Sequence, residues 1–367
     1  MARIATLDIN RGIAVLGLLF LNIYYFSMFE VGYVNLPVVP LSDSVIDWIN
    51  ALLLDGRFRS LFCLLFGAAL CLQMDKNGSD KQIKDRLFWI VTIGLLHGYI
   101  LWPGDILVSY GLAGFIALKY IDAGPSRLIR HGCGFGLFGV SMMLVLGSID
   151  VADPIIRGSS EFYEIVDNLP RDVMSHFGHN GVYYSIMLLI MPLITLWYSA
   201  GLMIAGIYCY KQGIFKHGLS NNAKPLVITA TALLSVGTIY LKVLDINSLS
   251  VLVDSLIWVN AFAGALLIIH CVVKMSRKGF QFSWLQAVGR MALTLYVFQS
   301  VLMVSFFYWV MPNGYEQYNR MEYMAIALLL SLFQLLIAPL YFRFFKQGPL
   351  EYLLKRLCLR SKEADYV

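Results

Sequence analysis

Residues Val251–Met275, VLVDSLIWVNAFAGALLIIHCVVKM, decide the fold class of this chain. The run contains one carboxylate, Asp254, and no Lys or Arg before Lys274. A helix that crosses the hydrocarbon core of a bilayer needs roughly 20 mainly apolar residues. This stretch is long and apolar enough to be such a helix, and similar stretches recur along nearly the whole chain.

The composition supports the same interpretation. The chain has 367 residues, of which 59% are hydrophobic and only 14% are charged, and its mean hydropathy is +0.69. Soluble domains carry roughly 25% charged residues, and one soluble core of this length cannot bury so much apolar surface. We therefore predict an all-α, polytopic integral membrane helical bundle that forms a single membrane domain over residues 1–367.

The apolar runs predict about ten transmembrane helices, at Ile13–Val31, Ser60–Met74, Leu87–Leu101, Ile106–Tyr120, Cys133–Ile149, Ile186–Tyr208, Leu226–Val243, Val251–Met275, Leu285–Val310 and Met324–Phe345. Residues 1–210 then hold the N-terminal helices and the catalytic core, 211–345 the C-terminal helices, and 346–367 a cytoplasmic amphipathic tail. Val45–Leu54 and Val182–Leu189, the latter before Pro192, are expected to be interfacial helices. Small residues in Gly132–Gly139 and Gly201–Gly206 predict close helix packing.

The distribution of basic residues predicts the orientation. Cytoplasmic loops of membrane proteins carry an excess of Lys and Arg. If the N-terminus is placed inside, most of the 28 Lys and Arg fall in inside segments, and the outside segments hold only Arg57, Arg59, Arg157, Arg171, Lys242 and Arg320. We therefore expect the N-terminus and the C-terminus to be cytoplasmic.

Several classes of function are disfavoured by the sequence. The net charge of +5 is spread along the chain, so no basic arm for a nucleic acid is expected. The six cysteines are scattered without a C-x-x-C pair, which disfavours a disulfide framework or a zinc site. His176 and His179 have a spacing that suits a metal, but they lack a nearby third ligand in a predicted loop. No metal is predicted.

Polar residues at bilayer depth are functional candidates, because each is costly unless it is paired. The topology places Asn22, His97, Asp105, Arg57 and Arg59 near one depth on the outer side. We interpret His97 as a general base or nucleophile that Asp105 orients. Asn22 or Arg59 would donate to a developing oxyanion. The structural alternative is that His97 caps one helix and Asp105 begins the next.

A second group of candidates lies at the predicted cytoplasmic ends of helices. Arg11 and Arg290 have glycine neighbours, and two such arginines suit a phosphate-bearing ligand. The alternative is a pair of snorkelling anchors, with Asp8 capping the first helix. The helix after Arg290 carries a polar stripe that suits ligand contact or helix–helix hydrogen bonds equally, namely Thr294, Gln299 and Ser300.

The chain resembles the YeiB family of bacterial inner-membrane proteins. The resemblance covers almost the full length. It is carried by LDINRGIA at 7–14, FRSLFCLLFG at 58–67, His97 followed by WPGDIL at 102–107, GRMALT at 289–294 and GPLE at 348–351. It implies a multi-pass protein of the bacterial inner (cytoplasmic) membrane. Membrane lipids and a second copy of the chain are candidate partners.

That family is similar in turn to a superfamily of transmembrane acyltransferases. The similarity implies acyl-CoA as the donor substrate, an extracytoplasmic hydroxyl or amine as the acceptor, and O- or N-acyl transfer as the reaction. Arg11, Arg290 and Thr294 would then bind the donor. Bacterial O-acetylases of the superfamily carry an Arg, ten residues and a His in their first helix, whereas this chain has Arg11 and Asn22 at that spacing. The departure moves the catalytic prediction to His97.

Two other functions fit the same residues. A membrane transporter or channel would line its path with these polar groups, although we find neither the internal repeats nor the broken helices that are frequent in transporters. A non-catalytic membrane scaffold or sensor with a degenerate site is the second alternative.

Overall fold

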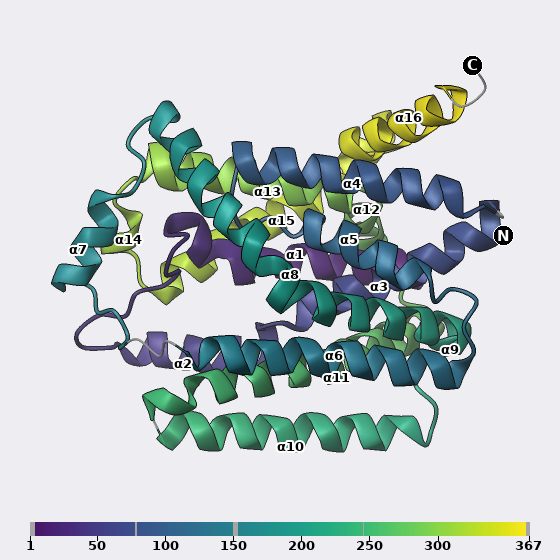
Figure 1. The fold of residues 1–367 in the computed structure, drawn as a ribbon, viewed down its shortest axis with the longest axis horizontal. Coiled ribbons are helices and arrows are strands. Elements are labelled where there is room, and N and C mark those ends of the chain that lie inside the picture. Colours follow the sequence, from purple (N-terminus) through teal and green to yellow (C-terminus); the bar gives the residue numbers. More distant parts are fainter. Residues whose placement is uncertain (1–3, 78, 150–152, 245, 365–367) are drawn as a thin grey trace.

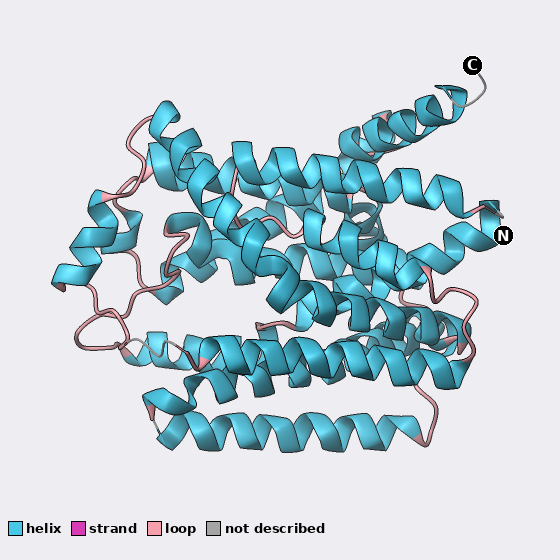
Figure 2. Ribbon diagram, viewed as in Figure 1, coloured by secondary structure: helices cyan, strands magenta, loops and turns pink. Residues whose placement is uncertain are grey.

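A computed structural model describes residues 4–77, 79–149, 153–244 and 246–364 of the chain. These residues form a helical bundle whose long helices run side by side (Figure 1). Loops connect the helices, and the described ranges contain no strand beyond one β-bridge between Asn35 and Ile156 (Figure 2). The predicted all-α architecture is therefore confirmed.

Eleven helices in the described ranges have 12 or more residues. They are α1 (Ala5–Ser27), α3 (Arg57–Asn77), α4 (Asp80–Ile100), α5 (Leu107–Leu118), α6 (Pro125–Gly147), α8 (Val173–Lys211), α10 (Ala223–Leu244), α11 (Ser250–Arg277), α13 (Ala292–Ser305), α15 (Arg320–Phe344) and, as the last, α16 (Pro349–Ala364). Shorter segments join them: α2 (Leu41–Ile49), η1 (Asn50–Leu54), α7 (Ser160–Asp167), α9 (Ile214–His217), η2 (Asn247–Leu249), α12 (Ser283–Arg290), η3 (Phe306–Val310) and α14 (Gly314–Gln317).

Eight helical stretches of the described chain are long and apolar enough to cross a bilayer. They are Ala5–Ser27, Leu41–Lys76, Pro125–Gly147, Val173–Lys211, Ala223–Leu244, Asn247–Arg277, Ala292–Val310 and Arg320–Phe344. The chain is therefore a helical membrane protein. α4 and α5 pack against each other beside these stretches, and α5 has only 12 residues.

The two ends of the bundle differ (Figure 1). We call the end that carries Ala5 and α16 the terminal end, because both chain termini lie there. The opposite end, with α2, α7 and α14, is the loop end. There the buried Arg157 guanidinium donates to the carbonyl oxygens of Val34, Glu316 and Tyr318 at 3.0–3.2 Å. One side chain thus ties three loops together.

Helix packing in the middle of the bundle depends on small residues. α8 packs against α6, α3 and α5. A Cβ on Gly201 of α8 would lie 2.6 Å from the Gly136 nitrogen of α6. A Cβ on Gly206 would overlap the Leu64 carbonyl oxygen of α3. The close packing predicted from the two small-residue stretches is confirmed.

Two predicted segments do not correspond to separate, continuous helices. Val182–Leu189 is not a separate interfacial helix, because α8 runs unbroken through Pro192 over 39 residues. The predicted helix Leu285–Val310 is divided at Met291 into α12, α13 and η3. The predicted tail 346–367 is described only as far as residue 364, where α16 ends.

Candidate functional site

His97 lies in the last turn of α4, inside the bundle. α4 ends a few residues before Pro103, and both Leu101 and Trp102 donate their N–H groups to the His97 carbonyl oxygen. The chain then turns into α5 through Asp105. The sequence predicted an outside turn here, but Trp102 and Asp105 are only 4% and 8% exposed. The turn therefore places His97 and Asp105 in the protein interior.

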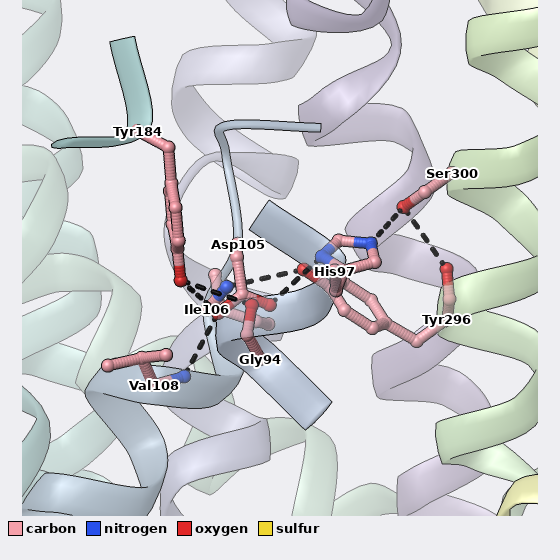
Figure 3. A network of polar contacts seen from close by, with 8 residues as sticks. All are labelled: Gly94, His97, Asp105, Ile106, Val108, Tyr184, Tyr296 and Ser300. Atoms are coloured by element: carbon pink, nitrogen blue, oxygen red, sulfur yellow. Dashed lines mark hydrogen bonds and ion pairs between the residues drawn. The ribbon is translucent and has the colours of Figure 1, made fainter. Parts of the chain in front are cut away.

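The imidazole of His97 contacts a carboxylate on one side and a hydroxyl on the other (Figure 3). Its Nδ1 lies 3.0 Å from Asp105 Oδ1, and its Nε2 lies 2.8 Å from Ser300 Oγ of α13. The His97 and Asp105 side chains are 1% and 0% exposed. The predicted pair is therefore brought together in a site that excludes water.

Asp105 is held in place through its second carboxylate oxygen. Oδ2 accepts the N–H of Val108 at 3.0 Å and the hydroxyl of Tyr184 at 3.4 Å. The Tyr184 hydroxyl also lies 3.1 Å from the Gly94 carbonyl oxygen. Gly94 and Gly98 make this approach feasible, because a Cβ at Gly98 would overlap the Tyr184 ring and one at Gly94 would lie 2.8 Å from Asp105 Oδ2.

This geometry directs the basic nitrogen of His97 toward a hydroxyl. A carboxylate beside Nδ1 favours the tautomer with the proton on Nδ1, which leaves the lone pair on Nε2. It also stabilises the imidazolium that forms when Nε2 accepts a proton. The arrangement is therefore suited to general-base chemistry.

A cavity of about 170 Å³ opens near the terminal end of the bundle. Three guanidinium groups line it, from Arg11 of α1, Arg86 of α4 and Arg290 of α12. Two carboxylates, Asp8 and Glu351, also line it. An adjoining pocket of about 230 Å³ shares two of these side chains and adds others, and its lining is Arg290, Lys346, Gln347, Glu351 and Lys355. The combined region has a basic excess.

Tyr296 connects the cavity to the buried site. It lines the cavity, and its ring packs on the His97 imidazole with centroids 5.1 Å apart. Its hydroxyl accepts the Ile106 N–H at 3.3 Å, one residue after Asp105. The Tyr296 side chain thus forms part of the cavity wall and also packs on His97.

Comparison with known proteins identifies the family of this chain. Residues 209–361 match the family described as "Protein of unknown function (DUF418)". The chain is 30% identical over 389 residues to "Uncharacterized protein YeiB" of Escherichia coli (strain K12), an alignment that covers 98% of this chain and 97% of that protein. The chain belongs to the YeiB family.

A more distant relative agrees with this assignment. The chain is 23% identical over 383 residues to "Uncharacterized protein YxaH" of Bacillus subtilis (strain 168), with 96% and 93% of the two chains covered. No solved structure matches this YeiB-family chain. The residues of its site must therefore be interpreted from their own geometry.

The glycines beside Arg11 and Arg290 serve helix packing in this YeiB-family protein. A Cβ on Gly12 would overlap the Leu285 carbonyl oxygen, and one on Gly289 would overlap that of Asp8. The sequence suggested that such glycines permit close approach to a phosphate. Instead they allow α1 and α12 to touch, which brings Arg11 and Arg290 to one cavity.

Thr294 is engaged by the C-terminal helix. Glu351 of α16 accepts the Leu293 and Thr294 N–H groups at 2.8 and 3.2 Å, and the Thr294 hydroxyl at 2.6 Å. A carboxylate at these positions caps the N-terminus of α13. The Thr294 hydroxyl donates to Glu351. This contact does not test the predicted role of Thr294 in ligand binding, which stays a prediction.

Arg86 is a further candidate, which precedes the predicted helix Leu87–Leu101 by one residue. It lies on α4, eleven residues before His97, which is close to three helical turns and hence the same face of the helix. Its guanidinium forms no hydrogen bond or ion pair with the described part of the chain, although it lines the cavity. The eleven-residue spacing was the signal that could have found it.

The other predicted members of the site lie apart from His97. Arg59 stacks over Trp258 of α11, with its guanidinium carbon 3.9 Å from the ring centroid. Arg57 is buried with its Nη1 3.5 Å from the Ala51 carbonyl oxygen. Asn22 is half-buried on α1. Over the described residues, no hydrogen bond or ion pair joins any of these three to His97 or Asp105, so their roles stay predictions.

The two histidines of the predicted loop lie in the first turns of α8 instead. His179 Nε2 is 2.6 Å from Glu30 Oε1, and His176 Nε2 is 3.2 Å from the Leu101 carbonyl oxygen. His176 is buried and His179 is partly buried. The described residues contain no group of three or more His, Cys, Asp or Glu arranged to hold a metal.

Proposed function

We propose that this YeiB-family protein is an acyl-CoA-dependent transmembrane acyltransferase, which transfers an acyl group to a hydroxyl or amine acceptor on the extracytoplasmic side. One observation carries the proposal. A cavity lined by three arginines at the terminal end reaches Tyr296, and Tyr296 packs on a buried His97 that is paired with Asp105. The arginine-lined cavity thus lies next to a candidate general base, His97.

The basic residues suit the charged part of coenzyme A. Coenzyme A carries a diphosphate and a separate 3′-phosphate, and guanidinium groups bind phosphate through paired charge-assisted hydrogen bonds. Arg11, Arg86 and Arg290 are our candidates for this contact, with Lys346 and Lys355 at the adjoining pocket. The slender pantetheine arm would then extend toward Tyr296, because apolar side chains line that part of the cavity.

The spacing of Arg86 and His97 agrees with the proposal. It is the spacing of an Arg, ten residues and a His, which the resemblance to acyltransferases led us to seek between Arg11 and position 22. On α4, this spacing places Arg86 at the donor cavity and His97 at the buried site on one face of the helix. Nε2 of His97 would remove the proton of an attacking hydroxyl, and Asp105 would stabilise the resulting imidazolium.

We further propose that about ten helices lie in the membrane, with both ends in the cytoplasm of a bacterium, in its inner membrane. In addition to the eight candidate stretches, α4 and α5 would lie within the membrane. At about 1.5 Å per residue the 12 residues of α5 reach only about 18 Å. The α4–α5 turn would therefore stop within the bilayer and hold His97 and Asp105 between the two membrane faces.

Thermal unfolding of the purified protein in detergent tests the donor. A ligand that binds only the folded state raises the melting temperature once its concentration exceeds its dissociation constant. We expect coenzyme A and acetyl-CoA to give a saturable shift. Replacing Arg86 by Gln should weaken binding by roughly tenfold, the size of one lost charge-assisted hydrogen bond. Arg130→Gln, an exposed arginine on α6, is the matched control.

The outcomes separate the candidate functions. A shift that Arg86→Gln weakens and Arg130→Gln does not would support the donor site. An absent shift at millimolar ligand would overturn the acyltransferase proposal and favour a transporter. In that case uptake of a solute by membrane vesicles should depend on His97.

A further inference from the structure

Ser300, His97 and Asp105 have the order of a nucleophile, a base and an orienting carboxylate. Ser300 Oγ lies 2.8 Å from His97 Nε2, and His97 Nδ1 lies 3.0 Å from Asp105 Oδ1. A hydroxyl, an imidazole and a carboxylate joined in this sequence can be recognised by their geometry on any fold. The three come from α13, from α4 and from the turn before α5 (Figure 3).

A serine inside an apolar helix has a simpler role, which must be weighed first. Its hydroxyl commonly donates to the carbonyl four residues earlier. Here the distance from Ser300 Oγ to the Tyr296 carbonyl oxygen is 3.4 Å, whereas the distance to His97 Nε2 is 2.8 Å. The hydroxyl is therefore closer to the base than to its own helix.

The position of Ser300 also suits a donor that arrives through the cavity. Tyr296, which lines the cavity, precedes Ser300 by one helical turn and packs on His97. Ser300 itself is 0% exposed. An acyl ester at this oxygen would be shielded from hydrolysis until an acceptor enters.

We propose that Ser300 carries the acyl group as a covalent ester between the two half-reactions. This inference rests on the proposed acyltransferase function and adds its intermediate. In the first half-reaction, Ser300 Oγ attacks the thioester carbonyl carbon while His97 Nε2 takes the serine proton. The carbon–sulfur bond then breaks, and His97 returns that proton to the departing thiolate of coenzyme A.

The second half-reaction repeats the proton transfers with the acceptor. A hydroxyl or amine attacks the ester carbonyl carbon, His97 takes its proton, the bond to Ser300 Oγ breaks, and His97 gives the proton to Ser300. The transfer requires no oxidant, reductant or further substrate. Because coenzyme A leaves before the acceptor binds, donor and acceptor need not occupy the buried site together.

Trapping the ester tests the inference. The purified full-length protein is incubated with radiolabelled acetyl-CoA without an acceptor, quenched in acid and digested. We expect close to one acetyl group per chain on the peptide that contains Ser300, with release of free thiol. Ser300→Ala should reduce the label at least tenfold. Ser305→Ala, on the same helix, should keep it.

Each outcome decides a different statement. If acetyl-CoA shifts the melting temperature of the wild-type protein but no label forms, or the label lies on another residue, the covalent role of Ser300 is wrong and the donor site stands. If acetyl-CoA gives neither label nor shift, the proposed function fails as well. Ser300→Cys controls for folding of the alanine variant, because a thiol of similar size should retain the label as a thioester.

Discussion

The role of the His97–Asp105 pair can be tested by a substitution at Asp105 that exchanges a single heavy atom. Asp105→Asn keeps the size of the side chain but removes the charge beside His97 Nδ1, so the imidazolium is no longer stabilised. We expect acyl transfer to fall by roughly 10²–10⁴-fold, while the midpoint of the melting-temperature shift with coenzyme A changes less than twofold.

The matched control is Asp80→Asn, an exposed carboxylate at the start of the same helix. It should leave both quantities unchanged. Equal loss of donor binding and transfer in Asp105→Asn would contradict a role confined to the chemical step, and would indicate that the α4–α5 turn has moved.

The site was only partly predictable from the sequence, and the distance along the chain explains why. His97 and Asp105 are eight residues apart, so a helix end followed by a turn was enough to place them together. Ser300 lies 203 residues after His97, and only the tertiary fold brings these side chains of α13 and α4 into contact. Arg59 failed to join them because Trp258 of α11 provides an aromatic face for its guanidinium.

Among the helices, α8 and α5 show which local rules the membrane fold overrides. A proline inside a helix normally kinks or breaks it, yet both the predicted helix Ile186–Tyr208 and α8 contain Pro192. Membrane helices tolerate such a proline because neighbouring groups satisfy the freed carbonyl, and α8 continues through it. α5 (Leu107–Leu118) lies within the predicted span Ile106–Tyr120 and is shorter by one residue at its start and two at its end.

The contact of α1 with α12 is expected to position Arg290 at the cavity, and this can be tested by substitution. A Cβ at Gly289 would overlap the Asp8 carbonyl oxygen, and a helix backbone cannot yield as a flexible side chain can. We expect Gly289→Ala to destabilise the protein by about 1–3 kcal/mol and to weaken coenzyme A binding by moving Arg290 away from the cavity. Thermal unfolding with and without coenzyme A measures both effects.

Gly134→Ala is the control for this substitution. Gly134 is exposed on α6, and a Cβ there would meet nothing within 4 Å. Alanine should be neutral or stabilise the helix by up to about 1 kcal/mol. If Gly289→Ala behaves in the same way, the α1–α12 contact does not position Arg290.

The docking of α16 can be tested through Glu351. Glu351→Gln removes the charge that caps α13 and leaves an amide that cannot accept from every present donor. We expect a loss of about 1 kcal/mol, which corresponds to roughly fivefold faster hydrogen exchange in α16. Glu164→Gln, on the exposed face of α7, should not change this exchange. Unchanged protection in Glu351→Gln would show that apolar contacts hold α16 without the cap.

For the molecule as a whole, the orientation of the bundle decides which membrane face each of its ends meets. Both termini lie at the terminal end (Figure 1), and the basic loops predict that this end is cytoplasmic. We expect a membrane-impermeant maleimide to label Glu164→Cys of α7 in spheroplasts and Leu353→Cys of α16 only in inside-out vesicles. Both positions are exposed, and the background replaces by serine the three native cysteines that are not buried, Cys133, Cys271 and Cys358.

The pattern of labelling bears on the mechanism as well as on the topology. An acyl-CoA donor exists in the cytoplasm, so the arginine-lined cavity must open there for the proposed reaction to occur. Labelling of Leu353→Cys in spheroplasts would place Arg11, Arg86 and Arg290 on the extracytoplasmic side, where they could not meet acyl-CoA. The acyltransferase proposal would then fail even if His97 and Asp105 proved essential, because the base would have no donor.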